Sequence, residues 1–129
     1  MAISINELNK AISSLAEAIK LYEKAAPGSI EQKAFRDACI QRFEYSLELS
    51  WKVSMKLLGS ATSAAKPAMR EMARNNLIKN PSDWIDFVDA RNNTSHSYDE
   101  EVARAVFGRI QQFLPCGHQL IFELQKIAT

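Results

Sequence analysis

Apolar side chains recur every three or four residues through most of the chain, which is the period of an amphipathic helix. The first such stripe follows Ser4, which has capping-box spacing with Glu7. The members of this stripe are Ile5, Leu8, Ile12, Leu15, Ile19 and Tyr22. The pattern stops at AAPGS, residues 25–29, so the sequence predicts one helix before this break.

A second, longer apolar pattern begins after Ser29, which again has capping-box spacing with Gln32. It predicts a helix from about Ile30 to Leu58, with Gly59 as the residue that ends it. Two apolar stripes run along this helix, one of Phe43, Leu47, Trp51, Met55 and Leu58 and one of Phe35, Cys39, Ser46, Leu49 and Val53. The polar stripe consists of Asp37, Gln41, Glu44, Glu48 and Lys52. A helix that is apolar over most of its circumference is expected to be central, and the short loop before it predicts an antiparallel first helix.

Two shorter helices are predicted after the small-residue linker GSATSAAK. Pro67 suits the first turn of a helix that reaches about Asn76. Asn80 is expected to cap the next helix, with Pro81 at its first position. This helix is predicted to run through SDWIDFVDARNNTSHS, residues 82–97.

The last predicted helix starts after Ser97 or Asp99, either of which could cap it. Its apolar stripe consists of Val102, Val106, Ile110, Phe113, Leu120, Leu124 and Ile127. Pro115 is expected to kink this helix or to divide it in two. The chain shows no repeat and no strand pattern. The sequence therefore predicts one all-α domain over residues 1–129, an up-and-down bundle of four to five helices.

The charge balance limits the classes of partner. The chain has 129 residues and a formal net charge of +1, so it lacks the broad basic surface with which proteins bind duplex DNA. Lys66, Arg70 and Arg74 nevertheless follow one another at four-residue steps and form a local basic stripe. This stripe could contact an RNA backbone or an acidic partner, or could simply be a solvated face.

Other chemistry is mostly absent from the sequence. Cys39 and Cys116 lie within helical patterns and are expected to be reduced thiols of a cytoplasmic protein. No leader-like or membrane-length apolar run is present. No residue cluster has metal-ligand spacing and no glycine-rich phosphate loop occurs, so neither a metal nor another cofactor is expected.

The stretch RNNTSHSYDE, residues 91–100, concentrates groups that could handle a phosphate or a proton. On a helical wheel, Arg91, Asn92 and His96 continue the apolar side of the fourth predicted helix. They are therefore expected to point into the bundle or into an interface. Arg91 and His96 would be roughly 140° apart on an ideal helix. They could meet if the last turn loosens, or if a second copy packs across a twofold axis.

These residue types suit metal-independent RNA cleavage. An arginine binds phosphate oxygens through its guanidinium fork, and a histidine can take or give a proton near neutral pH. The 2′-hydroxyl would attack the adjacent phosphate while Arg91 stabilises the developing charge and His96 manages protons. Asn92 could hold the ribose or phosphate, or orient His96. Equally, His96 could be a capping or packing residue, and Tyr98 alone could be a staple onto the next helix.

Two stretches resemble a known family. RNNTSHSYDE is similar to the R-N-x-x-x-H-x-Y-[DN]-E motif of the nucleotidyltransferase substrate-binding proteins, the HepT-like branch of the HEPN superfamily of helical bundles. FRDACIQRFEYSLELSWK, residues 35–52, resembles the long second helix of the same family. The resemblance covers most of the chain, including the order and lengths of its helices.

The resemblance implies a homodimeric, metal-independent endoribonuclease toxin of a toxin–antitoxin pair. By motif position, Arg91 and His96 would be catalytic, and Tyr98 would receive AMP from a partner MntA-type minimal nucleotidyltransferase that acts as antitoxin. AMP phosphates near Arg91 and His96 would compete with RNA. The main alternative is a non-catalytic substrate-binding subunit of a two-component nucleotidyltransferase. A plain dimerisation scaffold is a third interpretation.

Overall fold

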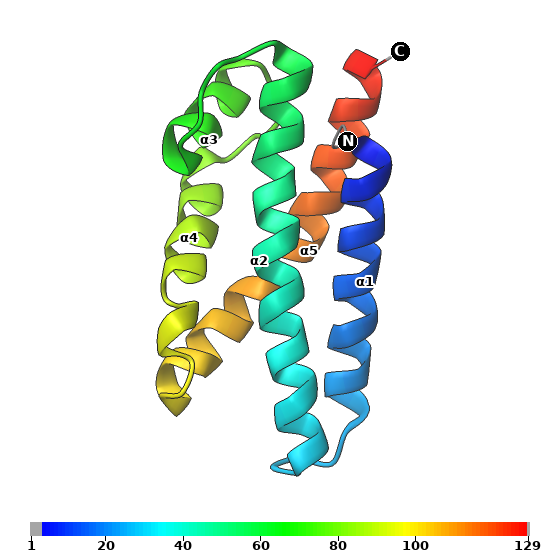
Figure 1. The fold of residues 1–129 in the computed structure, drawn as a ribbon, viewed down its shortest axis with the longest axis vertical. Helices are drawn as coiled ribbons and strands as arrows, with labels where there is room; N and C mark the ends of the chain where they lie inside the picture. The colour runs from blue at the N-terminus through cyan, green and yellow to red at the C-terminus, as the bar shows by residue number, and fades with distance from the viewer. Residues whose placement is uncertain (1–3, 129) are drawn as a thin grey trace.

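The computed structural model describes residues 4–128, which form five α-helices and a short 3-10 turn (Figure 1). The elements are α1 (Ile5–Lys24), α2 (Ile30–Leu58), α3 (Ala65–Arg74), α4 (Pro81–Asn92), the 3-10 turn η1 (Thr94–His96) and α5 (Glu100–Ala128). No strand occurs in this part of the chain. The predicted fold class, an all-α bundle with a long second helix, is confirmed.

The first two helices begin where the capping signals predict. The Ser4 hydroxyl accepts a hydrogen bond from the backbone N–H of Glu7 at 3.2 Å, and the Ser29 hydroxyl accepts one from Gln32 at 3.0 Å. At the end of α2, Gly59 has a φ of 66°, a left-handed conformation that glycine adopts without steric cost. Both predicted ends of α2 are therefore confirmed.

The predicted fourth helix is confirmed at its start and wrong at its end. α4 begins at Pro81 with Asn80 in the N-cap position, as predicted. The Asn80 side chain makes no capping bond, because its Oδ1 accepts from the Ser82 hydroxyl instead. At the other end α4 stops at Asn92 rather than continuing to Ser97. Just beyond this end, the Thr94 hydroxyl lies within hydrogen-bond distance of the carbonyl oxygen of Arg91, at 2.8 Å.

The last helix is continuous. Asp99 is its cap, since Oδ1 of Asp99 accepts from the N–H groups of Glu101 and Val102 at 2.9 and 3.4 Å. Pro115 lies inside α5 without dividing it. Of the two predicted effects of Pro115, the division of the helix is wrong, and a kink at this residue stays a prediction. Figure 1 shows α5 changing direction where it passes behind α2.

The second helix is central, as its two apolar stripes predict, because α1, α3, α4 and α5 all contact it. A cluster of aromatic side chains packs α2, α4 and α5 against one another. The Phe113 ring of α5 packs edge-on against Phe43 of α2 and against Trp84 and Phe87 of α4, with centroid distances of 5.4–5.6 Å. This cluster fixes α4, and therefore the residues that follow it, relative to α2.

None of the helices in residues 4–128 combines the length and the apolar character needed to span a membrane.

Candidate functional site

The residues singled out in the 91–98 stretch lie at the end of the bundle where α4 stops and α5 begins. In Figure 1 this turn, coloured yellow, connects α4 to α5. It faces the polar stripe of α2. A cavity of about 380 Å³ lies between the turn and α2. It is lined by Asp37, Ile40, Gln41, Glu44, Thr94, Ser95 and Ser97.

Arg91 lies in the last turn of α4, and its guanidinium points toward α2. Its Nη2 lies 3.8 Å from Oε2 of Glu48, and its side chain is 39% exposed. The Nε of Arg91 is buried and has no hydrogen-bond partner in the described chain. The Glu48 carboxylate also pairs with a second cation, since its Oε1 lies 2.8 Å from Nζ of Lys52. The Lys52 hydrogen bond and, more weakly, the charge of Arg91 hold the pKa of Glu48 below its usual value.

Because Arg91 is bound only loosely, it could accept an anion. An ion pair at 3.8 Å with both partners partly exposed contributes little to stability. The exposed part of the side chain could donate to a phosphate oxygen, whereas the buried Nε is out of reach of solvent. The guanidinium is therefore positioned but not saturated.

His96 and Asn92 do not lie as the wheel predicts. Both are exposed in the single chain, so they do not point into the bundle; that they face an interface with a second copy stays a prediction. The reason is that α4 ends at Asn92, which takes His96 off the helical wheel. The chain does loosen before His96, yet no hydrogen bond joins Arg91 to His96 within the described residues. The His96 side chain neither packs in the core nor caps a helix.

Tyr98 lies beside His96 on the same turn. Its side chain is 85% exposed, so it is not a staple onto α5. The ring centroids of His96 and Tyr98 are 6.2 Å apart at an interplanar angle of 67°. The turn thus presents an imidazole and a phenol together to solvent, next to the end of α4 that carries Arg91.

The basic stripe on α3 is only partly available. Lys66 is engaged, because its Nζ lies 2.7 Å from Oδ1 of Asp89 on α4. Arg70 and Arg74 are exposed and form no ion pair within residues 4–128. A role for these three cations in binding RNA stays a prediction.

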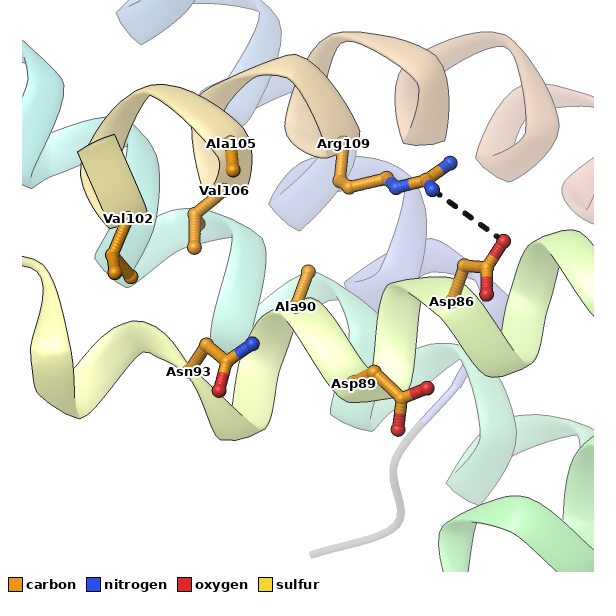
Figure 2. A pocket seen from close by; sticks show the side chains of 8 residues that line it. All are labelled: Asp86, Asp89, Ala90, Asn93, Val102, Ala105, Val106 and Arg109. Carbon is orange, nitrogen blue, oxygen red and sulfur yellow. Dashed lines mark ion pairs between the residues drawn. The ribbon is translucent and has the colours of Figure 1, made fainter.

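Sequence reasoning missed a second hollow, between α4 and α5. This cavity of about 220 Å³ has apolar walls from Val102, Ala105 and Val106 of α5 (Figure 2). At one end Nη2 of Arg109 lies 3.6 Å from Oδ2 of Asp86. Only the packing of α5 against α4 shows that Asp86 borders this cavity. No imidazole, thiol or phenol is among the described residues that line this second cavity.

The first comparison is with protein families and relatives of known sequence. The model of the family described as nucleotidyltransferase substrate binding protein like matches residues 3–126. A Haemophilus influenzae protein named "Probable ribonuclease HepT" is 35% identical over 106 residues. The aligned part covers 76% of this chain and 73% of that protein.

Two solved structures share the fold. One is a Haemophilus influenzae protein described as having the fold of a substrate-binding domain of a nucleotidyltransferase, with a TM-score of 0.80 and 31% identity over 94% of this chain and 98% of that one. The other is a Thermus thermophilus protein, with a TM-score of 0.72 and 31% identity over 88% of this chain and 98% of that one. The family match includes the whole of the α4–α5 turn and α2. This chain therefore belongs to the nucleotidyltransferase substrate-binding protein family, whose members include HepT.

Proposed function

We propose that this protein is a HepT-like HEPN toxin, a metal-independent endoribonuclease that acts as a homodimer. A partner MntA-type nucleotidyltransferase silences it by transferring AMP to Tyr98. The observation that carries the proposal is the α4–α5 turn, which presents the imidazole of His96 and the phenol of Tyr98 beside an unsaturated Arg91 guanidinium. The relative named as a probable ribonuclease supports the same activity.

The proposed reaction is a phosphoryl transfer within the RNA strand. The ribose 2′-oxygen attacks the adjacent phosphorus and loses its proton, the bond to the 5′-oxygen breaks, and that oxygen is protonated. The products are a 2′,3′-cyclic phosphate and a 5′-hydroxyl. Arg91 stabilises the charge that develops on the phosphate oxygens, and His96 exchanges the proton. Asn92, exposed beside Arg91, would hold the ribose or phosphate.

A second protomer completes the proposed site. Within one chain no hydrogen bond joins Arg91 to His96 in the described residues, and the His96 ring is exposed. A twofold dimer that packs around this turn would place the guanidinium of one protomer against the imidazole of its partner. Lys66, Arg70 and Arg74 would contact the RNA backbone outside the cleft. Lys66 would first have to leave Asp89.

The proposed control by the partner is electrostatic. An AMP group on Tyr98 adds a negatively charged phosphate close to His96, where the RNA phosphate would bind. The bound AMP would occupy Arg91 and exclude substrate. Tyr98 suits this modification because most of its side chain is accessible.

RNA cleavage by the purified chain tests the proposal. We expect the wild type to cut single-stranded RNA in the presence of a metal chelator and to leave DNA intact, because DNA lacks the 2′-hydroxyl. His96→Ala and Arg91→Ala should each lower the cleavage rate by about 100-fold or more with the helical fold kept. The matched control is His118→Ala, which removes the other histidine, also exposed, from α5.

The outcome can also favour the alternative. If the wild type cuts no RNA but binds nucleotide together with the transferase, and Arg91→Ala weakens that binding, the protein is a non-catalytic substrate-binding subunit. The solved relative described as a substrate-binding domain of a nucleotidyltransferase is the observation that favours this second function.

A further inference from the structure

In the described part of the chain, one side-chain hydrogen bond joins the segment between α4 and α5, residues 93–99, to α2. The side chains of this segment are mostly exposed, and Thr94 and Ser97 are the partly buried ones. The Oγ1 of Thr94 lies 2.7 Å from Oε2 of Glu44 on α2, fifty residues earlier in the chain. Among the described residues, no other hydrogen bond or ion pair connects a side chain of this segment to α2. The remaining contacts of the segment are local, within the turn or to the ends of α4 and α5.

Thr94 links two groups at once. Its hydroxyl lies 2.8 Å from the carbonyl oxygen of Arg91 as well as 2.7 Å from the Glu44 carboxylate. A hydroxyl has one proton, and the charged acceptor forms the stronger bond. Thr94 therefore sits where the end of α4, the turn and α2 converge.

The polar stripe of α2 thus contacts the candidate site at two neighbouring points, Thr94 in the segment and Arg91 in the last turn of α4. Glu44 and Glu48 are one helical turn apart on the same face. Glu48 approaches the Arg91 guanidinium at 3.8 Å, which is loose, whereas Glu44 binds Thr94 at 2.7 Å, which is tight. Of the two contacts with α2, the one to the turn is therefore the closer, and the one to the guanidinium is the looser.

We infer that Glu44 and Thr94 are a positioning pair that fixes the turn carrying His96 and Tyr98 relative to Arg91. Neither residue touches the scissile phosphate; each acts through the geometry of the turn. Without the pair, residues 93–99 would sample more conformations, and the productive arrangement of the imidazole would be populated less often. The consequence for catalysis rests on the proposed ribonuclease function, whereas the effect on the turn itself does not.

Four variants separate the possible roles of the pair. Thr94→Val removes both hydrogen bonds of the hydroxyl and keeps the branched shape. Glu44→Met removes the contact to α2 but leaves Thr94 free to cap the Arg91 carbonyl. Thr94→Ser and Glu44→Gln keep a hydroxyl and an acceptor oxygen, respectively, and serve as rescue variants.

The chain offers a matched control in another threonine–glutamate pair. The Oγ1 of Thr62 lies 2.8 Å from Oε1 of Glu71, in a similarly half-buried setting between the α2–α3 linker and α3. Thr62→Val therefore removes a hydrogen bond of the same type and similar length outside the proposed site. Any general loss of stability from such a deletion occurs in this variant too.

Two measurements are made on each variant after circular dichroism has confirmed its helical content. The first is amide hydrogen exchange of residues 93–99. The second is the kinetics of RNA cleavage. We expect faster exchange in the segment, and a kcat lower by roughly 10- to 100-fold, for Thr94→Val and Glu44→Met. KM should change little because Arg91 still binds the phosphate. Thr94→Ser, Glu44→Gln and Thr62→Val should resemble the wild type.

Three results would overturn the inference. The first is wild-type exchange and kcat in Thr94→Val. The second is a defect in Thr94→Val with wild-type behaviour in Glu44→Met, which would reduce Thr94 to a local helix cap. The third is an equal defect in Thr62→Val. If the wild type does not cleave RNA at all, the proposed function fails, and the exchange comparison alone then decides whether the pair holds the turn. Glu44→Met carries the test if Thr94→Val does not fold.

Discussion

At the residue scale, Arg91 has a defined position but lacks a full set of hydrogen-bond acceptors in the described chain. A buried donor without a partner costs about 1–3 kcal/mol relative to a bonded one. The Nε of Arg91 is in this state, while Nη2 has only a distant, shared carboxylate. A phosphate between the guanidinium and solvent would supply acceptors that Glu48 does not. The exposed part of the guanidinium is thus available to an anion, whereas the buried Nε is not.

The exposure of Tyr98 leads to a prediction about the modification. The chain has a second exposed tyrosine, Tyr45, which is 51% exposed and whose hydroxyl donates to Glu7 at 3.3 Å. With the partner transferase and ATP, Tyr98→Phe should abolish the gain of AMP mass, whereas Tyr45→Phe should leave it intact. Intact-protein mass spectrometry measures this. AMP addition that persists in Tyr98→Phe would mean that another residue is the acceptor.

Glu100 provides a pH prediction beside the same turn. Its carboxylate accepts from Nη1 of Arg36 at 2.7 Å, and this hydrogen bond followed by the charge of Arg36 lowers the pKa of Glu100. A lowered pKa in the folded state stabilises the fold above the unfolded pKa, and the contribution is lost as the pH falls through the folded pKa.

Glu100→Gln should therefore reduce the melting temperature modestly at neutral pH and make no difference in strong acid. Thermal melts between pH ~3 and ~7 test this, since that range includes the ordinary glutamate pKa. The matched control is Glu101→Gln, in the same first turn of α5 and without an ion pair among the described residues. Parallel melting curves for Glu100→Gln and the wild type across this range would contradict the prediction.

At the scale of elements, α5 approaches α1 closely at one point. The approach occurs at Gly117, where an added Cβ would lie 2.8 Å from Cδ1 of the fully buried Ile12 and 3.4 Å from the Phe113 ring. Gly108, earlier in α5, has nothing within 4 Å of the same position. The two glycines of one helix therefore face opposite packing situations.

This difference predicts opposite effects of alanine. Gly108→Ala should stabilise the fold by about 0.5–1 kcal/mol, because alanine loses less backbone entropy in a helix. Gly117→Ala has the same entropic advantage, but crowding in a packed core costs about 1–3 kcal/mol. Gly117→Ala should therefore unfold at lower denaturant concentration than Gly108→Ala. Equal midpoints in urea would show that Ile12 moves aside without cost.

At the scale of the whole molecule, the proposed site depends on a second copy. The single chain places Arg91 and the exposed His96 on adjacent elements without a hydrogen bond between them in the described residues. If each cleft takes its guanidinium from one protomer and its imidazole from the other, defects in different protomers can complement each other.

Mixing two inactive variants tests this arrangement. When Arg91→Ala and His96→Ala chains are unfolded together and refolded, half of the dimers are mixed, and one of the two clefts in each is intact. RNA cleavage should recover to roughly a quarter of the wild-type rate, as twofold symmetry requires. Each variant refolded alone is the control. No recovery in the mixture would show that both groups of a cleft come from one chain, or that the two clefts act only together.

Much of the fold follows from local sequence signals. The bounds of α2 are set by Ser29 and Gly59, whose capping chemistry depends on near neighbours only. The central place of α2 follows from apolar residues on most of its surface, which must be covered whatever the partners are. The motif 91–100 likewise identified the family from residue types and spacing alone.

Only the tertiary structure decided how the candidate site is held. The wheel placed His96 on the buried side of α4, but α4 ends at Asn92, so His96 does not lie on this helix. That Glu44 binds Thr94 across fifty residues, and that Arg91 keeps an unpaired Nε, depends on the angle at which α4 packs on α2. Periodicity carries no information on such contacts, because they form between elements rather than along one.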